Sequence, residues 1–284
     1  MVARAPAGGL AVGEEPAGAK GFFTDTTVCI GCKACEVACK QWNQLPDDGM
    51  FFSGMSYDNT VDLGASTWRH VEFVERPVAF GGQTTADGAF SWVFMSDVCK
   101  HCKSAGCLEN CPTGAIVRTE FDSVYVQPDV CNGCGYCVVG CPFGVIARRE
   151  DDGRAWKCTL CYDRLHDDMT PACAKACPTE SIVFGDLDEL RDRARTRVET
   201  LHERGVDDAY LYGVDEVSQP GTGGLNAFFL LVDEPEVYNL PPDPVAPSKT
   251  VRPAWLSAAA AAAAMVAMAV GSVIVGRGRS DGIA

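Results

Sequence analysis

The chain has 284 residues, sixteen cysteines and a formal net charge of −14. This acidity argues against nucleic acid as a partner, because the phosphate backbone is itself negatively charged. The length predicts one or two domains. A disulfide framework is typical of small secreted chains with scattered cysteines, whereas this chain is larger and its cysteines are clustered.

The N-terminal segment is rich in alanine, glycine and proline. Residues 1–20 contain neither the continuous apolar segment of a secretory signal nor a twin-arginine pair, so we expect a disordered extension. The first cysteine group follows, and its members are Cys29, Cys32, Cys35 and Cys39. Phe22 and Phe23 precede this group and are expected to cover a cluster, to pack in the core, or both. Lys40 follows Cys39, where each later group has a proline.

An insertion without cysteines covers residues 43–98. Residues 68–74 and 90–95 have the composition of strands. The segment is too long for a bare loop, so we expect a small sheet that lies against a partner subunit or over the first cysteine group. His70, in the first of these strands, is interpreted as a surface or core histidine rather than a metal ligand.

The second and third cysteine groups lie close together in the sequence. They consist of Cys99, Cys102, Cys107 and Cys111, and of Cys131, Cys134, Cys137 and Cys141. Residues 117–119 and 124–126 between them predict a short hairpin. His101 lies beside Cys102, but the cysteines already complete the ligand count, so we expect it near a cluster or on the surface.

The third group has the spacing C-x-x-C-x-x-C-x-x-x-C-P, which is the bacterial ferredoxin motif for [4Fe–4S] clusters. In that motif the fourth cysteine binds the other cluster of a pair. Gly133 and Gly135 suit the tight turns that such a motif needs. Structural zinc also uses paired C-x-x-C units, but it seldom uses this run, and four such groups would be unusual. We therefore expect iron–sulfur clusters.

The fourth group consists of Cys158, Cys161, Cys173 and Cys177. It follows a second predicted hairpin, formed by residues 145–148 and 155–156. The long gap between Cys161 and Cys173 is polar and predicts a loop or short helix that is exposed to solvent. The four groups together use all sixteen cysteines.

The part after the last cysteine predicts a helix and two strands. Residues 186–204 form the helix, with Asp186 as its N-cap and Glu189 three residues later. Strands are expected at 210–213 and 228–232, so that residues 186–239 complete the globular part. The proline-rich segment 240–253 predicts a linker.

Residues 254–276 contain no charged side chain. As a helix they would extend about 35 Å, which is enough to cross a hydrocarbon core of about 30 Å. Because this helix would have no polar face to turn toward water, we expect a single transmembrane anchor, followed by the tail 277–284. The positive charges on its two flanks are balanced, so they do not indicate its orientation.

The spacing favours a nested pairing of the groups, second with third and first with fourth. The expected cluster A is bound by Cys29, Cys32, Cys35 and Cys177. Cluster B is bound by Cys158, Cys161, Cys173 and Cys39. Cluster C is bound by Cys99, Cys102, Cys107 and Cys141, and cluster D by Cys131, Cys134, Cys137 and Cys111. The expected fold is α+β: two nested, loop-rich ferredoxin-like dicluster units over residues 21–185, with the inserted sheet and one C-terminal transmembrane helix.

Residues 22–43, FFTDTTVCIGCKACEVACKQWN, closely resemble the opening of the iron–sulfur (beta) subunit of respiratory formate dehydrogenase. The nested groups resemble the wider family of four-cluster subunits in molybdopterin oxidoreductases, which includes dimethyl sulfoxide and polysulfide reductases. The segment from Tyr210 to Tyr238 and the terminal anchor resemble the formate dehydrogenase branch in particular.

The resemblance implies four [4Fe–4S] clusters, a molybdenum or tungsten pterin catalytic subunit, and a cytochrome b subunit in the membrane. Electrons from formate would enter near the first group and leave toward haem and quinone. It also implies a globular part on the outer face of the membrane. No nucleophile–base pair stands out in the sequence, so we expect an electron-transfer subunit without catalytic residues. The alternatives are the same role in another pterin oxidoreductase, or a membrane-anchored zinc scaffold.

Overall fold

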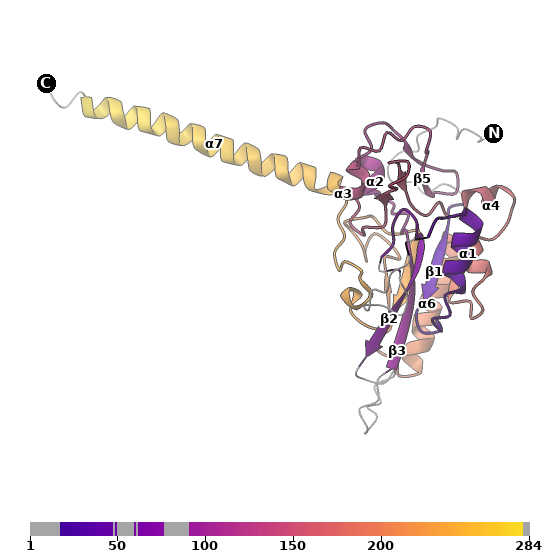
Figure 1. Cartoon of the computed structure of the whole chain (residues 1–284). Helices are drawn as coiled ribbons and strands as arrows, with labels where there is room; N and C mark the ends of the chain where they lie inside the picture. Colours follow the sequence, from indigo (N-terminus) through magenta and orange to yellow (C-terminus); the bar gives the residue numbers. More distant parts are fainter. Residues whose placement is uncertain (1–17, 48, 50–59, 61, 77–90, 281–284) are drawn as a thin grey trace. The chain divides into compact units, whose positions relative to one another are not determined.

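The structure is a computed structural model that describes residues 18–47, 49, 60, 62–76 and 91–280. The chain divides into two compact units, Met1–Ala246 and Pro247–Ala284, which are described separately. Figure 1 shows their elements. Nearly all of the predicted N-terminal extension lies outside the described residues.

A four-stranded sheet joins the two ends of the first unit. Its strand order is β8–β1–β10–β9, with β8 at Ile182–Asp186, β1 at Lys20–Asp25, β10 at Ala227–Leu231 and β9 at Tyr210–Tyr212. Strand β1 runs parallel to β10 and antiparallel to β8. The strands β9 and β10 confirm the predicted strands, whereas β1 and β8 were not predicted. Pairing of β1 with β8 brings the start of the first cysteine group beside the end of the fourth.

The two faces of this sheet contact different parts of the core. Helix α6 (Leu187–Glu203), which confirms the predicted helix, packs through Leu187 and Leu190 in the same apolar cluster as Phe23. Phe22 belongs to the other cluster, together with Cys35 and other cysteines. Successive residues of a strand point to opposite faces. Phe22 therefore covers the cysteines as expected, while Phe23 stacks instead on a phenylalanine of β10, at 5.6 Å between ring centroids.

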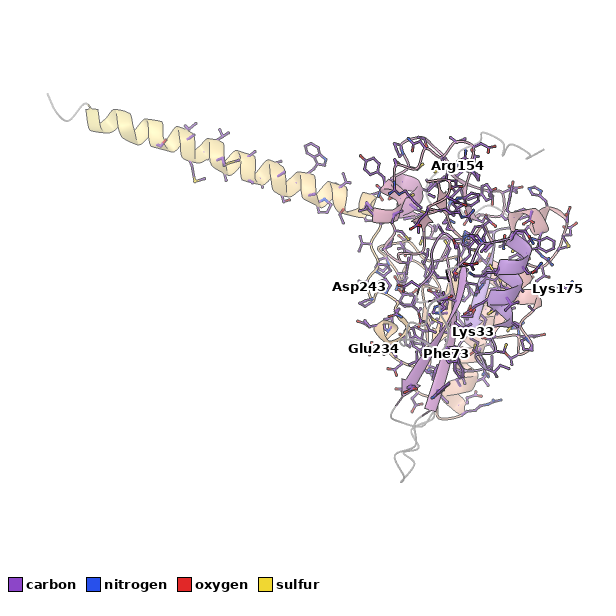
Figure 2. The ribbon with its side chains drawn as sticks, in the orientation of Figure 1. Lys33, Phe73, Arg154, Lys175, Glu234 and Asp243 are labelled. Carbon is purple, nitrogen blue, oxygen red and sulfur yellow. The ribbon has the colours of Figure 1, made fainter. Side chains whose placement is uncertain are left out.

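The predicted small sheet is present in the insertion, with β2 at Arg69–Arg76 paired antiparallel to β3 at Ser91–Val98. It lies over the first cysteine turn, because a Cβ atom on Gly31 would meet the Phe94 ring at 2.8 Å. In Figure 2 the labelled Lys33 and Phe73 lie close together, with the Lys33 ammonium 5.1 Å from the Phe73 ring centroid. Of the two positions expected for this sheet, the structure shows the one over the first group.

Two smaller hairpins separate the later groups, as predicted. The first is β4 (Ile116–Arg118) with β5 (Val124–Val126), and the second is β6 (Ala147–Arg148) with β7 (Ala155–Trp156). Strand β6 is shorter than predicted, and the two residues before it, Val145 and Ile146, are buried in the core.

Most of the remaining helices are short. They are α1 (Ala34–Asn43), α2 (Gly106–Glu109), α3 (Tyr136–Val139), α4 (Tyr162–His166), α5 (Ala172–Lys175) and the 3-10 helix η1 (Pro235–Tyr238). Helix α4 lies in the segment predicted to be exposed. The prediction is wrong for Arg164 and Leu165, which are buried.

The second unit contains helix α7 (Pro247–Ser280). Within it, Pro247–Ser272 is long and apolar enough, by length and composition, to cross a membrane. The helix begins before the predicted Ala254 and includes Pro253, so the end of the predicted linker is helical.

Candidate cluster-binding site

The four cysteine turns share one backbone conformation. The residue just before the second cysteine of each group is left-handed, and these residues are Gly31 (φ 65°), His101 (φ 45°), Gly133 (φ 73°) and Leu160 (φ 60°). This conformation reverses the backbone between two cysteines. At Leu160 it directs the backbone N–H toward the sulfur of Cys158, 3.4 Å away. The repeated turn indicates that all four groups are built for the same kind of ligand.

The third cysteine of every group lies on a short helix. Cys35 is on α1, Cys107 on α2, Cys137 on α3 and Cys173 on α5. Helices α2, α3 and α5 end before a Cys-Pro pair, because proline disfavours the helical conformation in the residue that precedes it. Lys40 replaces that proline in the first group, and α1 therefore continues to Asn43.

The structure brings the fourth cysteine of the first group to the fourth group. Burial raises the pKa of the Cys39 thiol well above its ordinary value, and the charges of Cys158, Cys173 and Cys161 raise it further. Such mutual effects require closely spaced sulfurs. These four cysteines are the expected ligands of cluster B.

The complementary contact involves Cys29 and Cys177. Burial raises the pKa of the Cys29 thiol, and the charges of Cys177 and Cys32 add to this effect. Backbone hydrogen bonds between β1 and β8 continue past the strands, where Asp25 N–H donates to Ser181 O at 2.8 Å. The strand pairing thus brings the fourth group's last cysteine to the first group, as expected for cluster A.

The second and third groups exchange their fourth cysteines in the same way. Burial raises the pKa of Cys102 and of Cys137, the latter to about 11. The pKa of Cys102 is raised further by the charges of Cys141, Cys99 and Cys107. The pKa of Cys137 is raised further by the charges of Cys131, Cys111 and Cys134. These sets agree with the nested pairing, whose ligand assignments stay a prediction.

Electrostatic effects between cysteines also link successive sets. Such effects join Cys35 with Cys173, Cys158 with Cys99, and Cys107 with Cys137. The sets therefore follow one another in the order A, B, C, D. The ends of this line are exposed at Cys32 and Cys134, whereas every cysteine of set B is buried. An arrangement of this kind can accept electrons at one surface and release them at another.

All sixteen cysteines are free thiols. No three His, Cys, Asp or Glu side chains in the described parts of the chain are arranged to hold a single metal ion.

A cavity in the core tests whether set C fits a cluster. It is lined by all four cysteines of the set and by Lys100, His101, Phe143 and Lys157. The Nδ1 atom of His101 accepts the Val124 N–H at 3.0 Å, so the neutral ring carries its proton on Nε2. Burial, first of all, holds the pKa of His101 well below its ordinary value and keeps the ring neutral.

The buried Nε2–H of His101 has no hydrogen-bond acceptor among the described residues. Such a donor is costly unless it finds a partner. A sulfide or thiolate of a cluster in this cavity would supply one. The residues present therefore fit a [4Fe–4S] cluster. His70 lies in the core, which is one of the two places expected for it, and its Nδ1 is 3.4 Å from the carboxylate of Glu72.

Burial also affects when these thiols can bind metal. It raises the pKa of Cys35 to about 11 and that of Cys161 to about 12. Without a metal these groups stay protonated at neutral pH, and iron must displace the protons because thiolate is the ligand. Cys111 differs, since hydrogen bonds from Thr113 and nearby backbone N–H groups outweigh burial and lower its pKa.

Buried cations lie beside the cysteines and were not predicted from the sequence. Arg69 is 1% exposed and donates from Nη2 to the sulfur of Cys173 at 3.3 Å. Lys157 is 2% exposed and donates from Nζ to the carbonyl of Cys158 at 3.0 Å. The position of Lys157 directly before a cysteine is the only local signal in the sequence, and Arg69 has none.

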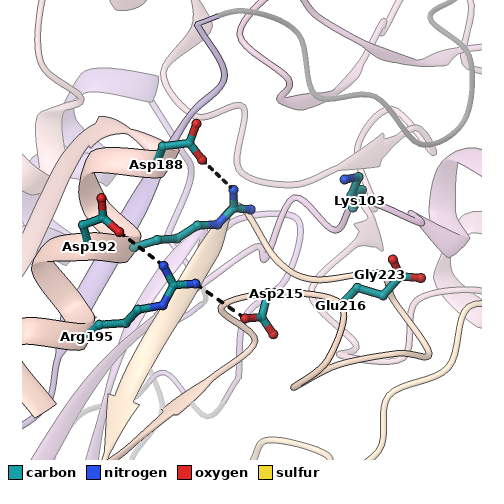
Figure 3. A pocket seen from close by; sticks show the side chains of 8 residues that line it. Lys103, Asp188, Asp192, Arg195, Asp215, Glu216 and Gly223 are labelled. Atoms are coloured by element: carbon teal, nitrogen blue, oxygen red, sulfur yellow. Dashed lines mark hydrogen bonds and ion pairs between the residues drawn. The ribbon is translucent and has the colours of Figure 1, made fainter.

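A surface pocket of a different kind is shown in Figure 3. Arg195 pairs there with Asp192 at 3.2 Å and with Asp215 at 3.7 Å, and Arg191 pairs with Asp188 at 3.2 Å. Because the pocket's carboxylates already neutralise both arginines, we assign it no ligand.

Known proteins are similar to this chain in sequence. Two family models, each described as a 4Fe-4S dicluster domain, match residues 28–115 and 90–187. The iron–sulfur subunit of the nitrate-inducible formate dehydrogenase of Escherichia coli is 39% identical over 224 residues, which are 78% of this chain and 71% of that protein. This protein belongs to the family of formate dehydrogenase iron–sulfur subunits.

Two further relatives show the breadth of the likeness. The formate dehydrogenase-O iron–sulfur subunit of Escherichia coli is 38% identical over 265 residues, or 90% of this chain and 84% of that protein. One subunit of the anaerobic dimethyl sulfoxide reductase of Escherichia coli is 34% identical over 173 residues, or 61% of this chain and 76% of that subunit. Two dicluster domains and sixteen cysteines account for four [4Fe–4S] clusters, with four ligands each.

Proposed function

We propose that this chain is the electron-transfer subunit of a membrane-bound formate dehydrogenase, and that it links a molybdopterin catalytic subunit to a cytochrome b subunit and quinone. The observation that carries the proposal is the linear order of the four cysteine sets, exposed at both ends and buried in the middle. The family supplies formate as the substrate of the complex.

The ligand sets of this proposal are the nested ones. Cluster A is bound by Cys29, Cys32, Cys35 and Cys177, and cluster B by Cys158, Cys161, Cys173 and Cys39. Cluster C is bound by Cys99, Cys102, Cys107 and Cys141, and cluster D by Cys131, Cys134, Cys137 and Cys111. The mutual electrostatic effects within each set support this assignment.

The bound clusters supply one-electron carriers, and the chain's own residues determine how they work. The cysteines hold them in line, the apolar core keeps water from the inner two, and nearby donors and charges set their potentials. No catalytic residue is required in this chain, because the reaction with formate belongs to the partner.

Exposed apolar side chains beside the end clusters are suited to docking. Ile30 and Val37 are 58% and 68% exposed near Cys32, and Tyr136 and Val139 are 61% and 89% exposed near Cys134. Apolar side chains in contact with water are stabilised when a partner covers them. We assign the end at Cys32 to the catalytic subunit and the end at Cys134 to the cytochrome b subunit.

The segment Pro247–Ser272 serves in this proposal as a single membrane anchor. Its alanine-rich surface suits close packing against other helices in a bilayer. By analogy with the family, the globular unit lies on the outer face of the membrane.

The test uses the complex purified anaerobically from detergent-solubilised membranes. Formate is added, and the reduction of the clusters is followed by EPR on rapidly frozen samples. We expect formate to reduce the clusters at a rate that matches turnover with a quinone analogue.

Reduction by dithionite but not by formate would overturn the proposal. Re-oxidation of the clusters by dimethyl sulfoxide would then assign the chain to the related reductases.

A further inference from the structure

Arg69 lies at the junction between two cysteine sets. Its Nη2 donates to the sulfur of Cys173 in set B at 3.3 Å. Its Nη1 donates to the hydroxyl of Ser96 at 3.3 Å, and that hydroxyl lies 3.2 Å from the sulfur of Cys35 in set A. Since Ser96 accepts from Arg69, its own proton is available for Cys35. One guanidinium thus reaches a ligand of each cluster.

The charge of Arg69 has no carboxylate partner in the described parts of the chain. Its remaining contacts are the Ser96 carbonyl at 3.1 Å and the face of the Phe22 ring, whose centroid is 4.8 Å away. An isolated buried charge is unfavourable. The cysteine sulfur that it contacts is that of Cys173, at 3.3 Å. The negative charge of a cluster bound through that thiolate would compensate the guanidinium.

Lys157 occupies the equivalent place at the next junction. It donates to the carbonyls of Val124 and of Cys158, a member of set B, and it lines the cavity of set C with Cys99 and Cys107. It too has no carboxylate partner within the described residues. Lys100 differs, because Asp97 forms an ion pair with it.

We propose that Arg69 is the residue that raises the reduction potentials of clusters A and B together, through its direct contact with Cys173 and through the Ser96 hydroxyl to Cys35. A cluster with four thiolates is anionic and becomes more negative when it is reduced, so a nearby fixed cation favours the reduced form. The inference rests on the proposed ligand sets. The hydrogen bonds of this guanidinium go to Ser96 and Cys173, and none goes to a cysteine of set C or D.

The test is an EPR-monitored redox titration of the intact complex with four variants of this chain. Arg69→Gln removes the charge, and Arg69→Lys keeps it. Ser96→Ala removes only the hydroxyl, and Lys157→Gln is the matched loss of a buried cation at the other junction. Iron content is measured in each preparation.

In Arg69→Gln we expect the midpoint potentials of two of the four clusters to fall. At a fixed potential, the ratio of reduced to oxidised cluster should then be about tenfold lower for each of the two. For a one-electron couple this is about 59 mV. Lys157→Gln lowers two midpoints, of which only one is shared with Arg69→Gln, because cluster B lies at both junctions. Ser96→Ala lowers a single midpoint, and Arg69→Lys restores most of the shift.

Four unchanged midpoints in Arg69→Gln with full iron content would overturn the inference, as would an equal shift of all four. If the Arg69→Gln complex does not assemble, Ser96→Ala and Arg69→Lys test the inference. Unchanged midpoint potentials in Ser96→Ala would contradict the path from Arg69 through the Ser96 hydroxyl to Cys35. These shifts do not depend on formate. A complex whose clusters formate fails to reduce refutes the proposed function and leaves the effect of Arg69 measurable.

Discussion

At the scale of single residues, the cysteine turns depend on whether a side chain has room. Gly133 is left-handed, at φ 73°, and a Cβ atom there would lie 2.3 Å from the backbone oxygen of Gly153. Gly114 has nearly the same backbone, at φ 67°, but a Cβ atom would meet nothing within 4 Å. A substitution at Gly114 therefore introduces backbone strain alone, whereas one at Gly133 adds a collision with the neighbouring hairpin.

Gly133→Ala is therefore expected to lose cluster D, giving about twelve iron atoms per chain instead of about sixteen. Gly114→Ala should lose only the roughly 1–2 kcal/mol of a left-handed alanine and keep all four clusters. Iron and acid-labile sulfide per chain measure the difference. Full iron content in Gly133→Ala would contradict this expectation and show that the hairpin at Gly153 moves away to make room for the alanine side chain.

The sequence predicted glycines in the tight turns, but it did not predict that other residue types adopt the same left-handed conformation there. Gly133 and Gly135 were expected in tight turns, and both are left-handed, at φ 73° and 81°. His101 and Leu160 adopt the same conformation at φ 45° and 60°. Residue type does not reveal this, because the strain is imposed by the surrounding fold. The same limit applies to Arg69, whose role depends on a strand pairing that brings Ser96 beside it.

At the scale of elements, one lysine determines the length of α1. Three groups have Cys-Pro after a short helix, whereas Lys40 lets α1 continue to Asn43. The extra turn positions Trp42, whose indole N–H donates to Asp163 at 2.8 Å and whose ring lies 4.1 Å from the guanidinium of Arg164. Helix α1 is thereby fastened to the fourth group, which shares cluster B with Cys39.

Lys40→Pro should break this helix and cost roughly 3 kcal/mol. We expect the temperature at which half of the absorbance near 400 nm is lost to fall by roughly 10 °C. Lys40→Ala keeps the helix and should change that temperature little. Equal temperatures for the two variants would show that the continuation of α1 does not stabilise the site.

Hairpins and the amphipathic helix were predictable, because their signals are local. Strands β2 and β3 pair with one another, and α6 has an apolar stripe that includes Leu187, Leu190 and Ala194. The strand β1 was missed. It pairs in parallel with β10, about two hundred residues later in the sequence, and no local pattern encodes such a partner.

At the scale of the whole molecule, the central sheet accounts for the nested pairing. Strand β8 follows the fourth cysteine group, strand β1 precedes the first, and their antiparallel pairing brings Cys29 and Cys177 together. The short hairpin β4–β5 does the same for the second and third groups. Spacing alone favoured this pairing, and the sheet supplies its physical cause.

The linear order of clusters depends on this pairing, and one ligand tests it most directly. Cys39 lies on α1 with Cys35 but is expected to bind cluster B. The decisive measurement is an EPR-monitored redox titration of Cys39→Ser, compared with Cys158→Ser and Cys29→Ser.

The nested pairing predicts that Cys39→Ser and Cys158→Ser alter the same midpoint and the same EPR signal, while Cys29→Ser alters a different one. If Cys39→Ser instead alters the signal that Cys29→Ser alters, the first group binds its own cluster, and the proposed line of four clusters is wrong.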